Sequence, residues 1–113
     1  MAETFNRASV ALTTTTITDV YQAPNIANAD RAVVLSCLVA NVNGTNNTAV
    51  TIDITDSTNT AIAKIVSTVV VPADATLEVI PNKLILKRGE KLRVTAQNSS
   101  HLEVTVSALE ITA

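Results

Sequence analysis

The sequence of 113 residues is poor in the side chains on which most binding and catalytic sites depend. Aromatic residues make up 2% of the chain, as Phe5 and Tyr21, and there is no Trp. Aromatic side chains are the usual anchors of ligand pockets and interface hot spots. Their scarcity argues against a sugar- or base-stacking site, so no small-molecule substrate is expected. An interaction surface would have to use broad aliphatic area and backbone pairing.

Cysteine, histidine and glycine are also scarce. Cys37 is the single cysteine, which excludes an intramolecular disulfide and a thiolate metal cluster. It lies among aliphatic residues, where a cysteine usually behaves as a small hydrophobic residue. His101, the single histidine, follows a polar turn and lacks the partnered nucleophile that a catalytic triad requires. With two glycines, Gly44 and Gly89, the chain has no phosphate-binding loop. The sequence therefore predicts no catalytic residue, no metal site and no cofactor.

Charge and hydropathy exclude further classes of protein. The net charge of −2 gives no basic footprint for nucleic acid. The first ten residues carry charges and lack the apolar core of a secretory signal. No apolar run approaches the roughly 20 residues that a membrane helix needs. We expect a protein that is made in a cytoplasm and contacts neither nucleic acid nor membrane.

What the chain does contain is alternation of apolar and polar residues with a period of two, which predicts β-strands. The alternation is clearest over residues 50–55, 91–97 and 102–107. Residues 31–42 and 61–71 are apolar on both faces, which predicts strands that are central in the fold or covered by a neighbouring subunit. Shorter strands are expected at 13–21, 76–80 and 83–86.

Turn chemistry agrees with this division. Asn43-Gly44 supplies the residues of a tight hairpin turn, and Gly89 is expected in the left-handed region. In the last strand the apolar residues change from even to odd numbers, which predicts a β-bulge near Ser107–Ala108. The fold class is therefore all-β: one β-sandwich, Ig-like or jelly-roll in type, of about eight antiparallel strands. Residues 1–12 are expected to form an N-terminal arm and residues 13–113 the sandwich.

Two polar clusters are candidate sites. Asp53 and Asp56 bracket an oxygen-rich turn that could hold Ca²⁺, but a calcium site normally gathers more than two carboxylates, which favours a solvated hairpin end. Five of the eight basic residues fall in one predicted hairpin, either as a solvated face that discourages edge pairing or as a patch that docks on an acidic protein lattice. With the N-terminal arm, this hairpin gives the predicted partner contacts: Phe5, Arg7, Lys83, Lys87, Arg88, Lys91 and Arg93.

Five segments spread over nearly the whole chain form a recognisable series: Val20–Pro24 (VYQAP), Ala32–Thr45 (AVVLSCLVANVNGT), Val70–Leu77 (VVPADATL), Lys83–Glu90 (KLILKRGE) and Leu102–Ile111 (LEVTVSALEI). Through these segments the chain resembles small virion proteins of tailed bacteriophages. Such proteins include head decoration, or cement, proteins that bind a capsid surface and clamp neighbouring capsomers. The resemblance implies a non-enzymatic structural protein on the capsid exterior of a virion.

The partners that the resemblance implies are the major capsid protein and copies of the chain itself. The expected assembly is a homo-oligomer, and a trimer if the protein occupies three-fold positions of the shell. Two alternatives remain at this stage. One is a small tail, neck or adhesin-associated virion protein, for which a ring would need a head-to-tail interface. The other is a soluble binding β-sandwich.

Overall fold

The computed structural model describes residues 2–80 and 82–113, which form strands, turns and loops and no helix. The strands that it describes are β1 (Ala2–Leu12), β2 (Thr18–Gln22), β3 (Ala29–Asn41), β4 (Thr48–Thr55), β5 (Ala61–Val71), β6 (Thr76–Glu78), β7 (Leu84–Lys87), β8 (Lys91–Ala96) and β9 (Leu102–Thr112). Because these residues form no helix, they contain no helix that could span a membrane.

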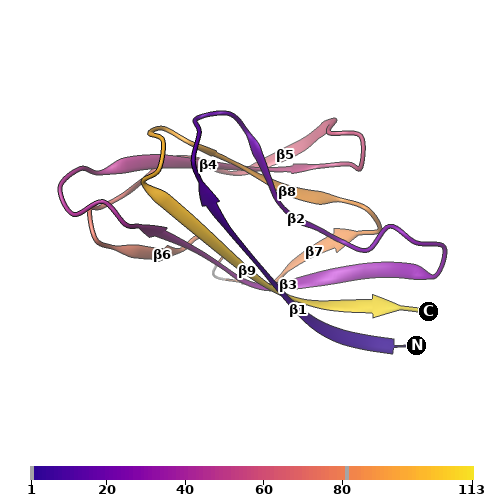
Figure 1. Ribbon diagram of the computed structural model, residues 1–113. Coiled ribbons are helices and arrows are strands. Elements are labelled where there is room, and N and C mark those ends of the chain that lie inside the picture. The colour runs from indigo at the N-terminus through magenta and orange to yellow at the C-terminus, as the bar shows by residue number, and fades with distance from the viewer. Residues whose placement is uncertain (1, 81) are drawn as a thin grey trace.

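The strands form two antiparallel sheets packed face to face, and the two termini lie side by side at one end (Figure 1). One sheet has the order β1-β9-β3-β6, with β7 also paired to β3, and the other has the order β2-β8-β4-β5. Strands from the two ends of the chain are neighbours in both sheets, which is the arrangement of a jelly roll. The predicted all-β sandwich is confirmed.

Alternation of side chains explains how the two sheets hold together. Inward residues such as Val34, Ile52, Leu86, Leu92 and Val104 are fully buried. They belong to one continuous aliphatic cluster between the sheets. Burying an aliphatic side chain of this size contributes roughly 1.5–3 kcal/mol. Aliphatic side chains therefore make up most of the core, and Tyr21 packs among them.

The segment predicted as an N-terminal arm is itself strand β1. It pairs with β9 in unbroken register, from Ala2 opposite Thr112 to Leu12 opposite Leu102. Leu12 is buried in the core, whereas residues 2–7 are exposed. The first strand therefore belongs to the sandwich, and the boundary at residues 12 and 13 separates no independent arm.

The predicted bulge lies in the neighbouring strand. Because β9 keeps its register with β1 throughout, Leu109 and Ile111 face away from the core and no phase change occurs near Ser107–Ala108. The register shift falls in β3, between Val34 and Ser36, directly opposite that point. Leu35 is the extra residue of β3, and it moves the inward positions from even to odd numbers.

Three connections cross between the sheets where the sequence suggested otherwise. Residues 13–17, taken as part of a strand, link β1 in one sheet to β2 in the other. The Asn43-Gly44 segment joins β3 to β4 across the sandwich, and the positive φ predicted there is absent from both residues. The turn with Gly89, whose φ is 76° as expected, joins β7 in one sheet to β8 in the other. The predicted basic hairpin is thus divided between two layers.

Strand β5 is an edge strand, although its sequence is apolar on both faces. Ile62, Val69 and Val70 are exposed to 54%, 40% and 53%. The strand is irregular, because its register with β4 shifts and Thr68 has a φ of 54°. Such irregularity is one of the ways by which proteins discourage pairing at an exposed edge.

Candidate functional site

The outer face of the four-stranded sheet carries a row of alternating charge. Asp19, Arg93, Asp53 and Lys64 come from β2, β8, β4 and β5 and lie opposite one another in register. Arg93 Nε donates to Asp19 Oδ1 at 2.5 Å, and Lys64 Nζ donates to Asp53 Oδ1 at 3.2 Å. We call these four residues the charged row. Each carboxylate in it has a cation of the same sheet within contact.

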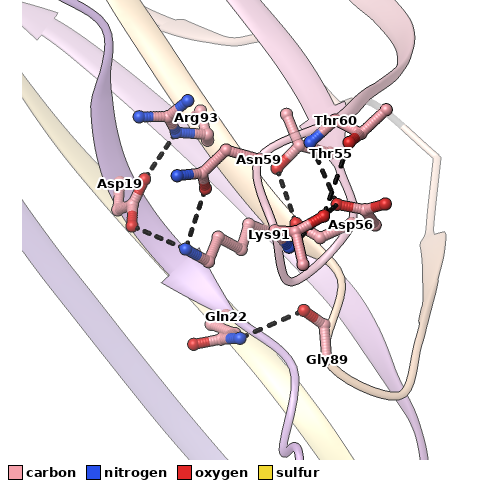
Figure 2. A network of polar contacts seen from close by, with 10 residues as sticks. Asp19, Gln22, Thr55, Asp56, Asn59, Thr60, Gly89, Lys91 and Arg93 are labelled. Carbon is pink, nitrogen blue, oxygen red and sulfur yellow. Dashed lines mark hydrogen bonds and ion pairs between the residues drawn. The ribbon is translucent and has the colours of Figure 1, made fainter.

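A polar network extends the charged row towards the β4–β5 turn (Figure 2). Lys91 Nζ donates to Asp19 Oδ2 at 3.0 Å and to Asn59 Oδ1 at 2.9 Å. Burial opposes the charge of Asp19, but the hydrogen bonds from Lys91 and Arg93 outweigh it and hold its pKa below 3.8. The Lys91 and Arg93 side chains are only 13% and 17% exposed. Both cations therefore already have hydrogen-bond acceptors within the chain.

The two carboxylates considered for Ca²⁺ do not converge. Asp53 is buried against Lys64, whereas Asp56 organises the β4–β5 turn. One oxygen of Asp56 accepts hydrogen bonds from the Thr58 amide, the Thr58 hydroxyl and the Thr60 amide. The bond from the Thr58 side chain is the main cause of the lowered pKa of Asp56. Within residues 2–80 and 82–113, no three His, Cys, Asp or Glu side chains gather closely enough to bind a metal.

The outer face of the five-stranded sheet carries an apolar row in place of charges. Phe5 lies opposite Leu109, Leu109 opposite Val33, and Val33 opposite Ile85, so four strands each contribute one side chain. Their neighbours along the strands, among them Val34, point into the core. Phe5 and Ile85, at the two ends, are exposed to 76% and 60%, and Leu109 and Val33 are partly exposed. We call these four residues the apolar row.

Charged residues line one side of the apolar row. The next row in register contains Glu3, Ile111, Arg31 and Lys87. Glu3 lies at the β1 end and Lys87 at the β7 end, so opposite charges stand at opposite ends, while Arg31 is paired with Asp30. On the other side of the apolar row, the bulge of β3 leaves a hollow of about 480 Å³. Its lining residues are Phe5, Asn6, Arg7, Leu35, Ser107 and Ala108.

The structure separates the seven predicted partner contacts into two groups. Phe5, Arg7 and Lys87 lie on the outer face of the five-stranded sheet, with Lys83 and Arg88 exposed just beyond the two ends of β7. The last two predicted contacts, Lys91 and Arg93, lie on the opposite face of the sandwich and are held by Asp19. The seven residues therefore do not form one patch.

Neither of the chemically reactive groups considered from the sequence lies in a site. Cys37 is fully buried in the core, and burial, with a smaller effect of the Glu78 carboxylate, raises the pKa of its thiol to about 12. His101 Nε2 lies 3.3 Å from the Asn43 side-chain nitrogen, and its other ring nitrogen is buried without a hydrogen-bond partner in the described part of the chain. The positions of these groups supply no nucleophile–base pair.

A polar cluster between the sheets escaped the sequence analysis. Tyr21 is 5% exposed, and its hydroxyl donates to Glu110 Oε2 at 2.5 Å. Asn6 Nδ2 donates to the same oxygen at 3.1 Å. Burial, followed by the hydrogen bond and charge of Glu110, raises the pKa of Tyr21 strongly. The cluster links β1 and β9 of one sheet to β2 of the other by hydrogen bonds, so it connects the two sheets at this end.

A second hollow, of about 340 Å³, lies between β5 and β6. Ile65, Val66, Val69, Leu77 and Val79 contribute apolar side chains to it. It lies between the edge strands of the two sheets.

The sequence singled out Phe5 of the apolar row as a contact residue, but it did not single out the other three members. Val33, Ile85 and Leu109 each occur in segments where neighbouring residues are also apolar. Which of them share a face depends on the register between four strands, and period-two alternation does not determine register.

Comparison with known proteins finds likeness at the level of fold. No protein-family model matches this sequence, and no curated protein matches it. A solved structure from Bacillus endospore appendages, described as a family of disulfide-linked pili, is similar with a TM-score of 0.57. The alignment covers 97% of this chain and 88% of the other, at 17% identity. At that identity, the similarity supports the sandwich fold alone.

Proposed function

We propose that this protein is a non-enzymatic structural subunit that joins a larger protein assembly through the outer face of its five-stranded sheet. The observation that carries the proposal is the apolar row, since Phe5 and Ile85 stand exposed at its two ends. Exposed apolar residues that are contiguous and bordered by polar ones are typical of interaction sites, whereas scattered ones need no explanation.

The opposite face supports the same choice of surface. There, the charged row satisfies its own charges with partners from the same sheet. A surface whose ionic groups are already paired gains little from a new partner, because binding would have to desolvate those groups first. The apolar row has no such cost, and covering it removes aliphatic and aromatic area from water.

The assembly that we propose is the capsid of a tailed bacteriophage, with this protein as a head decoration protein on the virion exterior. The resemblance of the sequence to small virion proteins of these phages favours this assignment. Its partners would then be the major capsid protein and copies of itself. Lys83 and Arg88, exposed just beyond the two ends of β7, would contact an acidic shell.

A fibre subunit is the second candidate, favoured by the structural similarity to the endospore appendage protein. A disulfide-linked fibre is not part of this proposal. Cys37 is the single cysteine, and it is fully buried with a pKa raised to about 12, so its thiol is neither accessible nor ionised at neutral pH. Subunits of this chain would have to join through non-covalent contacts.

The test is localisation and loss of function in particles produced by the genome that encodes this chain. Antibody labelling should mark the heads of intact virions, and particles lacking the protein should release DNA at lower temperature. Adding back the purified protein should restore heat resistance. Labelling confined to tails or to cell-surface fibres, or particles that are equally heat-resistant without the protein, would overturn the head assignment.

A further inference from the structure

We infer that the apolar row is a self-association surface and that its partner is the same row on a second copy of this chain. The inference rests on the proposed structural role and names the first contact through which the subunit assembles. It follows from the order of charges beside the row, from the shape of the face and from two-fold symmetry.

The row is long and straight enough to be covered by a similar row. Neighbouring strands lie about 4.8 Å apart, so four side chains on β1, β9, β3 and β7 span roughly 15 Å across the sheet. Ile111, in the next row, faces outward but is only 9% exposed, so the exposed apolar area is that of the row itself. Two aliphatic sheet faces of this kind pack as the two layers of a sandwich do.

A two-fold axis brings opposite charges together in both arrangements that superpose the rows. If the axis runs along the strands, β1 of one copy faces β7 of the other, and Glu3 lies opposite Lys87 of the second copy. If the axis runs along the row, each strand faces its own copy, and Glu3 lies opposite Arg7 of the second copy. A two-fold interface repeats each contact twice, so Glu3 gains a cation in either case.

The basic residue Lys83 does not oppose this pairing. It precedes β7 and is exposed, so its long side chain can turn towards solvent when another cation approaches. The charged row on the other sheet offers no comparable arrangement. Its carboxylates already contact Arg93 and Lys64 within one chain, so their charges have partners in the same sheet.

The first experiment compares two matched substitutions by light scattering of the purified chain. Wild-type protein should sediment and scatter as a dimer at micromolar concentration. Phe5→Asp should raise the dimer dissociation constant at least tenfold, because it places a charge in the apolar row. Ile62→Asp is the control, since Ile62 is also an exposed strand residue, at 54%, but lies on β5 of the other sheet. It should leave the dimer unchanged.

Both variants should melt within a few degrees of wild type, because both side chains are largely exposed. A monomeric wild-type protein would overturn the inference while leaving virion localisation intact. A dimer that survives Phe5→Asp but is lost in Ile62→Asp would overturn it as well, because the β5 edge would then be the interface. A dimer without virion labelling would instead contradict the proposed function alone.

The second experiment identifies the symmetry axis by charge exchange. Glu3→Lys should weaken the dimer several-fold. Adding Lys87→Glu should restore it if the axis runs along the strands, and adding Arg7→Glu should restore it if the axis runs along the row. Restoration by neither partner, with the single variants folded, would overturn the face-to-face arrangement.

Discussion

The two outer faces of this sandwich are built from similar strands but solve the problem of solvent exposure in different ways. The four-stranded sheet places Asp19, Arg93, Asp53 and Lys64 across its strands in alternating sign. The five-stranded sheet places aliphatic and aromatic side chains in the corresponding direction. One face pairs the charges of its row within the chain, although Ile62 of β5 stays exposed, and the other leaves a row of apolar area for a partner.

The comparison teaches that the composition of a whole chain is a poor guide to its interaction surface. Basic residues cluster in sequence around β7 and β8, which suggested one basic patch. In the structure, Lys91 and Arg93 are held by Asp19 on one face, while Lys87 lies on the other. A charge contributes to binding where the fold leaves it unpaired, so the sheet to which a residue belongs matters more than its neighbours in sequence.

The largest effect on stability should come from truncating an isoleucine in the buried part of the outer face of the five-stranded sheet. Ile111 and Ile85 lie on the same outer face, but their exposures are 9% and 60%. Ile111→Ala should lower the free energy of unfolding by about 2–3 kcal/mol, because it opens a cavity under its neighbours. Ile85→Ala should cost less than about 0.5 kcal/mol.

Both variants are best measured by urea unfolding in the Phe5→Asp background, since dimer formation would add to the apparent stability of the folded state. Equal losses at the two positions would mean that this face is covered uniformly. The distinction between a buried and an available part of the five-stranded sheet would then fail.

The second effect is smaller, and it is the dependence of stability on pH that a residue of the five-stranded sheet causes. Cys37 is buried in the five-stranded sheet, and its pKa rises from 9.0 to about 12. The unfolded thiol releases its proton above pH 9 while the folded one retains it. Cys37 therefore leaves the free energy of unfolding undiminished below pH 9 and lowers it as pH rises further, by about 1 kcal/mol per pH unit.

Cys37→Ala should remove most of this slope between pH 9 and 10. The pKa of Tyr21 is also raised from an ordinary value of 10.0, but Tyr21 lowers stability mainly above pH 10, because its unfolded hydroxyl ionises there. The measurement is the free energy of unfolding at pH 8, 9 and 10 for both proteins. A wild-type slope that persists unchanged in Cys37→Ala would show that another group causes the alkaline loss.

The sequence predicted the sandwich because alternation is a local property. Residues 50–55 alternate as expected, with Val50, Ile52 and Ile54 in the core. The positions of bulges and the choice of sheet are not local. The apolar pattern predicted a bulge in the last strand, but the extra residue is Leu35 of the neighbouring strand β3. One sequence does not reveal which of two paired strands carries the extra residue.

The candidate site was predicted in part for the same reason. Phe5 stood out because aromatic residues are scarce, and Arg7 and Lys87 were named with it. The remaining members of the apolar row could not be selected, since each becomes a neighbour of the next through register across four strands. The predicted strand over residues 13–21 failed in its first half, where the threonine run forms the crossing between the two sheets and β2 starts at Thr18. High β-propensity did not outweigh that topological requirement.

The smallest effect should come from weakening the charged row. Asp19 is half exposed, at 50%, so Asp19→Asn should lower the free energy of unfolding at pH 7 by less than about 1 kcal/mol. The pKa of Asp19 lies below its ordinary value of 3.8: burial opposes its charge, but the hydrogen bonds from Lys91 and Arg93 prevail. This stabilisation is present above pH 3.8 and is lost as pH falls through the folded pKa, because the unfolded carboxyl binds its proton first.

The difference in stability between wild type and Asp19→Asn should therefore shrink below pH 4, while the dimer of a Phe5-containing chain keeps its apolar contact at every pH in that range. Urea unfolding at pH 7, 4 and 3 measures the first quantity, and light scattering of the same samples measures the second. A difference that stays constant from pH 7 to pH 3 would mean that the Asp19 carboxylate is not paired in solution. The four-stranded sheet would then carry an unpaired carboxylate that a partner could bind, and the contrast between the two outer faces would be lost.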